Sequence, residues 1–315
     1  FIALSGGTGE QETGGGLGSL EFSFGLNASS SQIDQYDTEA FRSVIGREAA
    51  DDRTVTLRAE GDHTLGSRGT LRSAFTFAEV ERDEVLTPGG VASYRQRLWG
   101  LGIESEWSMG DRDATRFSIG AALDGSDTPE SGDKPPVDRL GNFGYRAGVS
   151  SLVQDGLILH GSLSRRSRFP SLRELYSGAL GRFEPNPQLE LETLLGSEAG
   201  LTLETDHSSI QAVGFYQSLE NKIVRSSFKG TDGILRFKRI NHKRVKSVGL
   251  EVLAVRAMGV VTVSGDLTVQ NASGIDVDGT RVELEYEPFI TGRLGFETPL
   301  GDIFRASGNL RFMGS

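Results

Sequence analysis

The feature that most constrains this chain is an alternation of apolar and polar residues over stretches of about ten residues. In the stretch 261–270, Val261, Val263, Leu267 and Val269 are aliphatic and the even-numbered positions between them are polar. Side chains along a β-strand point to opposite faces with a period of two, so such a stretch has one apolar and one polar face. The 3.6-residue spacing of a helix is not found here. The pattern therefore predicts an all-β chain whose strands separate an apolar environment from a polar one.

The pattern predicts about 14 strands, most of them longer than the five or six residues usual in soluble proteins. They are expected at 17–27, 31–39, 52–65, 69–79, 93–108, 114–125, 140–154, 157–166, 191–205, 209–220, 245–257, 260–271, 281–298 and 302–313. Short turns are expected at 28–30, 66–68, 109–113, 155–156, 206–208, 258–259 and 299–301, and long loops at 40–51, 80–92, 126–139, 167–190, 221–244 and 272–280. Short and long connections alternate, which is typical of a transmembrane antiparallel up-and-down β-barrel and not of a sandwich or a propeller.

Two tryptophans give a check on the strand length. Trp99 and Trp107 share a strand face with Leu101 and Ile103. At about 3.3 Å per residue they lie about 26 Å apart along the strand, which becomes about 20 Å across a membrane after a tilt of about 40°. This separation favours an aromatic girdle at each edge of the apolar band. Two half-buried tryptophans in a soluble sheet are the alternative.

Composition excludes several kinds of function. The net charge of −10 disfavours binding to nucleic acid. Cysteine is absent and the four histidines are scattered, so the sequence contains no recognisable metal site, and no cofactor is expected. No run of 18 apolar residues occurs, which excludes transmembrane helices.

The sequence offers little for catalysis. The glycine-rich start, 6–16, lacks the Lys-Ser or Lys-Thr of a phosphate-binding loop and is expected to be an outer loop. No GxSxG motif or cysteine nucleophile is present. Glu104 and Glu106 share one strand face, where they are an acid–base pair or, as we favour, residues that line a barrel interior. The chain is therefore not expected to be an enzyme, with a barrel enzyme of the outer-membrane lipase or protease type as an alternative.

Two groups of basic residues lie where strands meet long loops. Arginine forks match carboxylate or phosphate oxygens with two parallel hydrogen bonds. The candidates for capture of an anionic ligand are Arg165, Arg166, Arg168, Lys238, Arg239, His242 and Lys243. The alternative is a solvated rim whose cations pair with lumen acids or with lipopolysaccharide phosphates.

A series of short motifs runs through residues 160–255. It begins with a Ser-Arg-rich strand, an Arg-x-Pro turn and a Glu-Leu-Tyr segment, and continues with Asn-Pro-x-Leu, Glu-Thr and Glu-x-Gly-Leu elements. In this order the motifs resemble those of TonB-dependent outer-membrane receptors. The matching residues, for which the resemblance implies a structural role, are Pro170, Glu174, Leu175, Tyr176, Asn186, Pro187, Leu189, Glu192, Glu198, Gly200, Asn241, Gly249 and Glu251.

The chain also departs from this family. Leu191 stands where a proline usually precedes the Glu-Thr element, and Phe169 stands where a small residue is common. A plug domain and an energy-coupling box are not found, and the family barrel has 22 strands around a plugged lumen. We therefore expect residues 1–315 to be one domain, a partial receptor β-barrel without a plug, with barrel strands missing from both ends.

The resemblance implies a function in the outer membrane of a Gram-negative bacterium. The expected function is active import of a scarce, bulky nutrient of the iron–siderophore or cobalamin class, with energy from a TonB-type protein acting through the plug. Expected partners are outer-membrane lipid and lipopolysaccharide, the TonB-type protein, and a metal chelate or cobalamin. Ligand contacts are implied for the loops 167–190 and 221–244. The alternative is a passive pore of about 14 strands.

Overall fold

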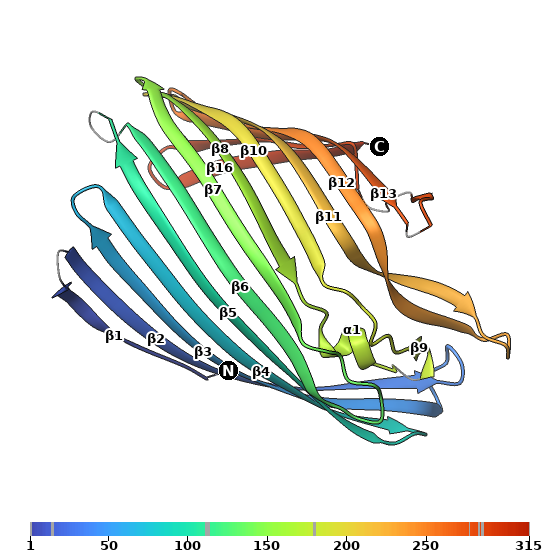
Figure 1. The fold of residues 1–315 in the computed structure, drawn as a ribbon. Coiled ribbons are helices and arrows are strands. Elements are labelled where there is room, and N and C mark those ends of the chain that lie inside the picture. The colour runs from blue at the N-terminus through green and yellow to red at the C-terminus, as the bar shows by residue number, and fades with distance from the viewer. Residues whose placement is uncertain are drawn as a thin grey trace.

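The computed structural model describes residues 2–13, 16–110, 114–178, 181–276, 278–282, 284 and 287–314, with only the backbone described for 2–13, 16, 17, 243 and 282. Nearly all of this chain forms one curved antiparallel sheet (Figure 1). Within the described ranges, 14 strands follow one another in hydrogen-bonded order and two short strands attach beside them. The predicted all-β, up-and-down architecture is confirmed.

The elements are long and mostly consecutive in the sheet. The main strands are β1 (Ile2–Thr13), β2 (Gly16–Tyr36), β3 (Val44–Leu65), β4 (Gly69–Thr87), β5 (Val91–Met109), β6 (Thr115–Ser131), β7 (Leu140–Gln154), β8 (Leu157–Arg168), β10 (Glu192–Thr205), β11 (Ser208–Lys229), β12 (Leu235–Met258), β13 (Val261–Ile275), β15 (Ile290–Leu300) and β16 (Phe304–Gly314). The short β9 (Phe183–Glu184) pairs in parallel with β12, and β14 (Arg281–Val282) pairs with β13. The helix α1 (Leu172–Tyr176) lies between β8 and β10. No helix in the described ranges has the length and hydropathy needed to span a membrane.

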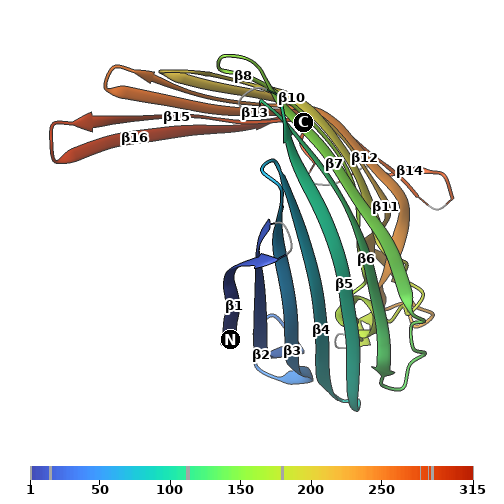
Figure 2. The same ribbon diagram turned by 60° about the vertical axis from the view of Figure 1, so that its left-hand side comes forward.

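The sheet curls without closing. β1 pairs only with β2 and β16 only with β15, and the two end strands are well separated in Figure 2. Helix α1 and β9 lie within the curve of the sheet, near the long-loop ends of the strands (Figure 1). The concave face at this rim is therefore the place where residues distant in sequence can meet.

The two faces of the sheet differ as the alternation predicts. On β5, Tyr94 and Gln96 point to the concave face and are buried against the connection that contains α1. Trp99, Leu101 and Trp107 occupy odd-numbered positions on the opposite, convex face and remain 39%, 53% and 42% exposed. An exposed apolar band on the outer surface suits contact with lipid. The role of Trp99 and Trp107 as a girdle remains a prediction.

Trp99 covers a glycine on the neighbouring strand. Gly125 of β6 is its cross-strand partner, and a Cβ built on Gly125 would lie 2.2 Å from two ring atoms of Trp99. An aromatic ring over a glycine shields the backbone at that position and helps to hold the strand register. We expect Gly125→Val to displace the ring and to lower the free energy of unfolding of the full-length protein by about 1–3 kcal/mol. The temperature at which gel mobility shifts in SDS measures this loss.

Gly102 provides the matched control for this substitution. It lies in β5, and a Cβ built there would meet no atom closer than 3.9 Å. Gly102→Val is expected to leave the transition temperature unchanged or to raise it, because valine favours strands. Equal losses for the two variants would contradict the role assigned to the Trp99 ring.

Two predictions near the N-terminus are wrong. The stretch 28–30, expected as a turn between 17–27 and 31–39, lies inside the continuous strand β2, and the expected loop 6–16 contributes to β1 and β2, with residues 14 and 15 outside the described ranges. Small polar residues favour turns, but pairing with β3 overrides that preference here. Ser30 Oγ donates to Asp51 Oδ1 at 2.5 Å across this pair.

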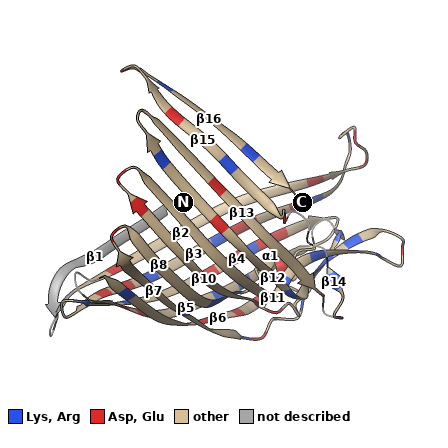
Figure 3. Ribbon diagram, turned by 90° about the horizontal axis from the view of Figure 1, so that it is seen from above, with Lys and Arg blue, Asp and Glu red and all other residues tan. Residues whose placement is uncertain are grey.

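Several expected long loops are instead extensions of strands. Residues 44–51, 80–87, 126–131, 221–229, 235–244 and 272–275 belong to β3, β4, β6, β11, β12 and β13. Beyond the apolar band neither face needs apolar residues, so the alternation stops while backbone pairing continues. Ion pairs take the place of apolar contacts, as between Arg95 Nε and Glu81 Oε1 at 3.0 Å. Figure 3 shows residues of both charge signs interspersed on neighbouring strands.

The strand expected at 281–298 is also shorter than predicted. β14 covers only Arg281–Val282 and β15 begins at Ile290. Pro288 precedes β15 and has no N–H for a ladder hydrogen bond, which accounts for the late start of that strand. Residues 283, 285 and 286 lie outside the described ranges.

Candidate functional site

The connection between β8 and β10 folds onto the concave face of the sheet. Residues Leu172, Leu175 and Tyr176 of α1 are buried, and they form an apolar cluster with Tyr94 of β5 and with Leu189. Leu175 and Tyr176 are 1% and 0% exposed. The partly buried side chains around this cluster are Val80, Ala92, Val137 and Ile223. The connection 169–191 is therefore a packed element and not a free loop.

Tyr176 links this connection to two other parts of the rim. Its ring stacks on Tyr94, with centroids 5.3 Å apart and planes 9° from parallel. Its hydroxyl donates to the carbonyl of Pro135 at 3.3 Å and accepts from the N–H of Val137 at 3.1 Å. The Glu-Leu-Tyr segment of the sequence motif is thus the anchor of the connection.

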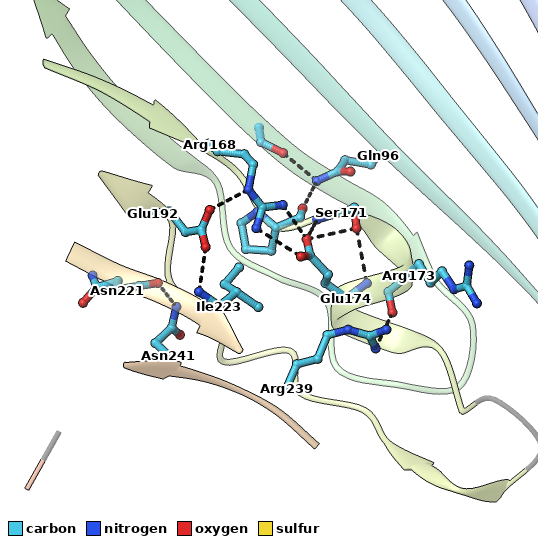
Figure 4. Close-up of polar contacts among 12 residues, drawn as sticks. Gln96, Arg168, Ser171, Arg173, Glu174, Glu192, Asn221, Ile223, Arg239 and Asn241 are labelled. Carbon is cyan, nitrogen blue, oxygen red and sulfur yellow. Dashed lines mark hydrogen bonds and ion pairs between the residues drawn. The ribbon is translucent and has the colours of Figure 1, made fainter. Parts of the chain in front are cut away.

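A hydrogen-bonded cap begins α1. The Ser171 side chain accepts from the N–H of Glu174 at 3.3 Å, and the Glu174 carboxylate accepts from the N–H of Ser171 at 2.9 Å. Gln96 Nε2 donates to the carbonyl of the buried Pro170 at 2.8 Å. These contacts fix the point at which the chain leaves β8 (Figure 4).

Arg168 completes the cap instead of facing an open site. Its guanidinium donates to both carboxylate oxygens of Glu174, at 2.8 and 3.0 Å, and to Glu192 at 2.6 Å. The hydrogen bonds to Glu174 and then to Glu192 raise the pKa of Arg168 above its usual value. Burial alone would raise the pKa of Glu174, but Arg168 and the Ser171 N–H lower it on balance. Arg168 is therefore occupied by acids of its own chain.

Three asparagines fasten the second half of the connection to β11 and β12. Asn186 Nδ2 donates to the carbonyl of Arg239 at 2.8 Å. Asn241 Nδ2 donates to the carbonyl of Asn221 at 2.6 Å, and Asn241 Oδ1 accepts from the N–H of Glu190 at 3.0 Å. Asn221 has a φ of 56°, a left-handed conformation that asparagine tolerates better than most residues. These asparagines hold the backbone of the connection in place.

The remaining motif residues lie in the same region or in the strands next to it. Pro187 lies in the connection, Glu198 and Gly200 in β10, and Gly249 and Glu251 in β12. Gly249 lies beneath the ring of Phe215, whose Cζ would be 2.5 Å from a Cβ at that position. A bulky ring against the strand leaves no room for a side chain there.

The other predicted cations have different environments. Lys238 Nζ donates to Glu184 Oε1 at 2.9 Å, and His242 Nδ1 lies 3.2 Å from Asp276 Oδ1. Arg165 donates to Asn142 Oδ1 at 2.8 Å and to the carbonyl of Phe143. Arg166 lines a hollow of about 640 Å³ on the concave face, together with Arg72, Arg146 and Glu104 among others. The side chain of Lys243 lies outside the described part of the structure.

A cluster of arginine and phenylalanine surrounds the remaining candidate, Arg239. The Arg225 guanidinium carbon lies 4.9 Å from the ring centroid of Phe237, which is 5.3 Å from the centroid of Phe183. The guanidinium carbon of Arg239 lies 4.8 Å from the Phe183 centroid, and Arg239 Nη1 donates to the carbonyl of Arg173 at 3.0 Å. We call Arg173, Phe183, Arg225, Phe237 and Arg239 the Arg–Phe cluster.

The Arg–Phe cluster could not be read from sequence spacing. Register pairs Arg225 with Arg239 across β11 and β12, and the parallel pairing of β9 with β12 places Phe183 beside Phe237. Burial holds the pKa of Arg239 below its ordinary value; Arg173 and Arg225 lower it further, against the attraction of Glu174. In the described residues, the cluster therefore brings together three guanidinium groups that have no acidic side chain within ion-pair distance.

A second charged group is buried on β3 and β4. The side chain of Arg82, 7% exposed, lies 3.3 Å from Glu48, 2.9 Å from Asp52 and 3.6 Å from Glu84. The side chains of Glu48 and Glu84 are each 2% exposed. Burial, followed by the charge of Glu48, raises the pKa of Glu84. The Arg82 guanidinium is thus the ion-pair partner of two fully buried carboxylates.

The acidic residues singled out from the sequence were also compared with the structure. Glu104 is paired with Arg146, so it belongs to an ion pair across the concave face. In the residues that the structure describes, no three His, Cys, Asp or Glu side chains are placed to hold a metal ion.

Comparison with known proteins identifies the architecture. The family model described as TonB dependent receptor-like, beta-barrel, matches residues 7–315. The copper transporter OprC is similar in structure, with a TM-score of 0.81 and 16% identity over 98% of this chain and 51% of that chain. The siderophore receptor PirA from Acinetobacter baumannii is similar with a TM-score of 0.68 and 15% identity, over 95% of this chain and 48% of that chain. The ferric enterobactin receptor PfeA from Pseudomonas aeruginosa is similar with a TM-score of 0.70 and 16% identity, over 97% of this chain and 48% of that chain. The chain spans about half the length of these proteins, and no curated protein sequence matches it.

Proposed function

Because the chain belongs to the TonB-dependent receptor β-barrel family, we propose that its protein is an active-transport receptor in the outer membrane of a Gram-negative bacterium. The match over residues 7–315 is the observation that carries this proposal. The family comprises receptors for transport and not enzymes. In this proposal the residues form part of a barrel domain of about 22 strands, the plug lies outside them, and a TonB-type protein supplies the energy.

The proposed ligand is a metal chelate, with the iron–siderophore class first and cobalamin second. The similar structures include a copper transporter, a siderophore receptor and a ferric enterobactin receptor, which supports a metal-containing ligand. Lys238 and Arg239 lie on β12, which pairs with β11 beside the packed connection 169–191, and this supports a ligand with negative charge. Among the predicted cations we retain Arg166 and Arg239 as candidate contacts, since Arg168 and Lys238 already have acidic partners. The exposed convex band is the proposed contact with lipid and lipopolysaccharide.

A passive pore of 14 strands is the second candidate. The described residues form 14 strands in series, and this is an even number, as in single-chain outer-membrane barrels. The open sheet opposes it, because β1 and β16 do not pair and lipid does not tolerate unpaired strand edges. The open sheet therefore favours the larger barrel.

Uptake of radioactive iron by the source bacterium distinguishes these candidates. The probes are iron-loaded chelators purified from its own culture medium and, in parallel, radiolabelled cobalamin. A receptor predicts uptake that is lost on deletion of the gene and equally lost when the TonB-type protein is removed. Uptake that depends on the gene but not on the TonB-type protein would favour the pore. Uptake that does not change on deletion of the gene would reject both the receptor and the pore.

A further inference from the structure

Three guanidinium groups of the Arg–Phe cluster have no acidic partner in the described structure. Seven other arginines toward the long-loop ends of the strands do have one: Arg47, Arg82, Arg95, Arg97, Arg168, Arg236 and Arg244. The whole chain carries a net charge of −10, so acids are plentiful. Glu174 is the acid whose charge attracts Arg239, but both of its carboxylate oxygens already accept hydrogen bonds from Arg168. What distinguishes Arg173, Arg225 and Arg239 is that these three guanidinium groups meet in one cluster.

The phenylalanines orient two of these cations. Arg225 lies over Phe237, Phe237 contacts Phe183, and Arg239 lies over Phe183, at centroid separations of 4.9, 5.3 and 4.8 Å. A guanidinium whose face lies on a ring can still form hydrogen bonds through its N–H edges and loses little further entropy in doing so, although Arg239 Nη1 already donates to the carbonyl of Arg173. Arg225 and Arg173 are exposed while Arg239 is half-buried, so the cluster has an accessible side. The two forks are thus ordered before any ligand arrives.

The chemistry of the cluster selects one class of ligand. Guanidinium forks match paired oxygen atoms, and their hydrogen bonds to anions are about twice as strong as neutral ones. Three neighbouring cations favour a ligand with more than one negative charge, because such a ligand relieves their mutual repulsion. We propose that the Arg–Phe cluster binds a multiply anionic metal chelate that presents paired oxygens, as carboxylates or catecholates do. This inference rests on the proposed function and narrows its ligand class.

The test uses the full-length protein in detergent and isothermal titration with three probes. Iron(III) citrate presents carboxylates, the iron(III) tris-complex of dihydroxybenzoate presents catecholates, and the iron(III) tris-complex of acetohydroxamate is uncharged. We expect binding of at least one anionic probe and a loss of affinity of about tenfold in Arg225→Gln. The affinity of Arg225→Lys should lie between those of the wild type and Arg225→Gln, because lysine keeps the positive charge but lacks the planar guanidinium fork. The anionic probe that binds identifies the source of the paired oxygens.

Lys229 offers a matched control on the same strand as Arg225. It is an exposed cation of β11 that lies outside the Arg–Phe cluster, so Lys229→Gln should change affinity by less than about twofold. Equal affinity of wild type and Arg225→Gln for an anionic probe would overturn the inference, as would binding of the uncharged probe alone or of none. TonB-dependent uptake that survives such a result leaves the proposed function standing, whereas uptake without TonB dependence rejects that function separately.

Discussion

Tyr176→Ala is expected to release the connection 169–191 from the concave face at a cost of about 3–5 kcal/mol of docking free energy. The side chain is fully buried, stacks on Tyr94, and holds the rim through Pro135 and Val137. Its removal leaves a cavity beneath α1, and the Val137 N–H then keeps only its bond to Thr128 Oγ1 at 2.9 Å. Hydrogen exchange of residues 169–191 in the full-length protein measures the loss of protection, and ligand affinity should fall with it.

Two substitutions separate docking from general destabilisation. Tyr176→Phe keeps the ring and removes only the hydroxyl, so it should cost only about 0.5–1.5 kcal/mol, because the Val137 N–H keeps its bond to Thr128 Oγ1. Tyr216→Ala removes an aromatic side chain that is 38% exposed, and it should leave exchange in 169–191 unchanged. If Tyr176→Ala also leaves that exchange unchanged, the packing assigned to this connection is wrong.

Arg82→Leu is expected to lower the free energy of unfolding by about 3–5 kcal/mol near neutral pH. Arg82 is the cation within ion-pair distance of the buried carboxylates of Glu48 and Glu84, and its loss removes that partner from both. Thermal unfolding of the full-length protein in detergent measures the effect. The triple variant Arg82→Leu, Glu48→Gln and Glu84→Leu should recover most of the loss, because it removes the stranded charges together with their partner.

The loss in Arg82→Leu should also depend on pH. The pKa of Glu84 is raised in the folded state, so its contribution to stability is complete below the unfolded pKa and is lost as pH rises through the folded value. Removing Arg82 takes away the charge that opposes this shift. The deficit of Arg82→Leu should therefore shrink as the solution is acidified from neutral pH toward the carboxylate range. A deficit that is constant over that range would contradict the role assigned to the buried carboxylates.

The order of the strands was predictable because apolar and polar residues alternate within each strand, and this alternation reflects the different environments of the two faces of the sheet. Residues 261–270 and the Trp99 strand show it, and the structure pairs their strands consecutively as expected. The same signal failed at 80–87 and 221–229, where neither face needs apolar residues and only backbone pairing maintains the strand. It also failed at 28–30, where small polar residues predict a turn but the neighbouring strand β3 keeps them extended.

The contacts of the candidate residues were predictable only in part. The motif at 164–176 includes the residues that cap α1, but the sequence does not show that Arg168 binds Glu174 and Glu192, because Glu192 lies 24 residues further along the chain. The environment of Arg225 could not be predicted from the sequence, because its neighbours Phe237 and Arg239 lie on another strand.

By itself the sequence determined an all-β chain with one apolar and one polar face, since each strand carries its own period of two. It also determined the family, through short motifs that are contiguous in the chain. Only the tertiary structure decided which cations are paired and which are free. That outcome depends on strand register and on the inward fold of 169–191, which bring together side chains that are far apart in the sequence.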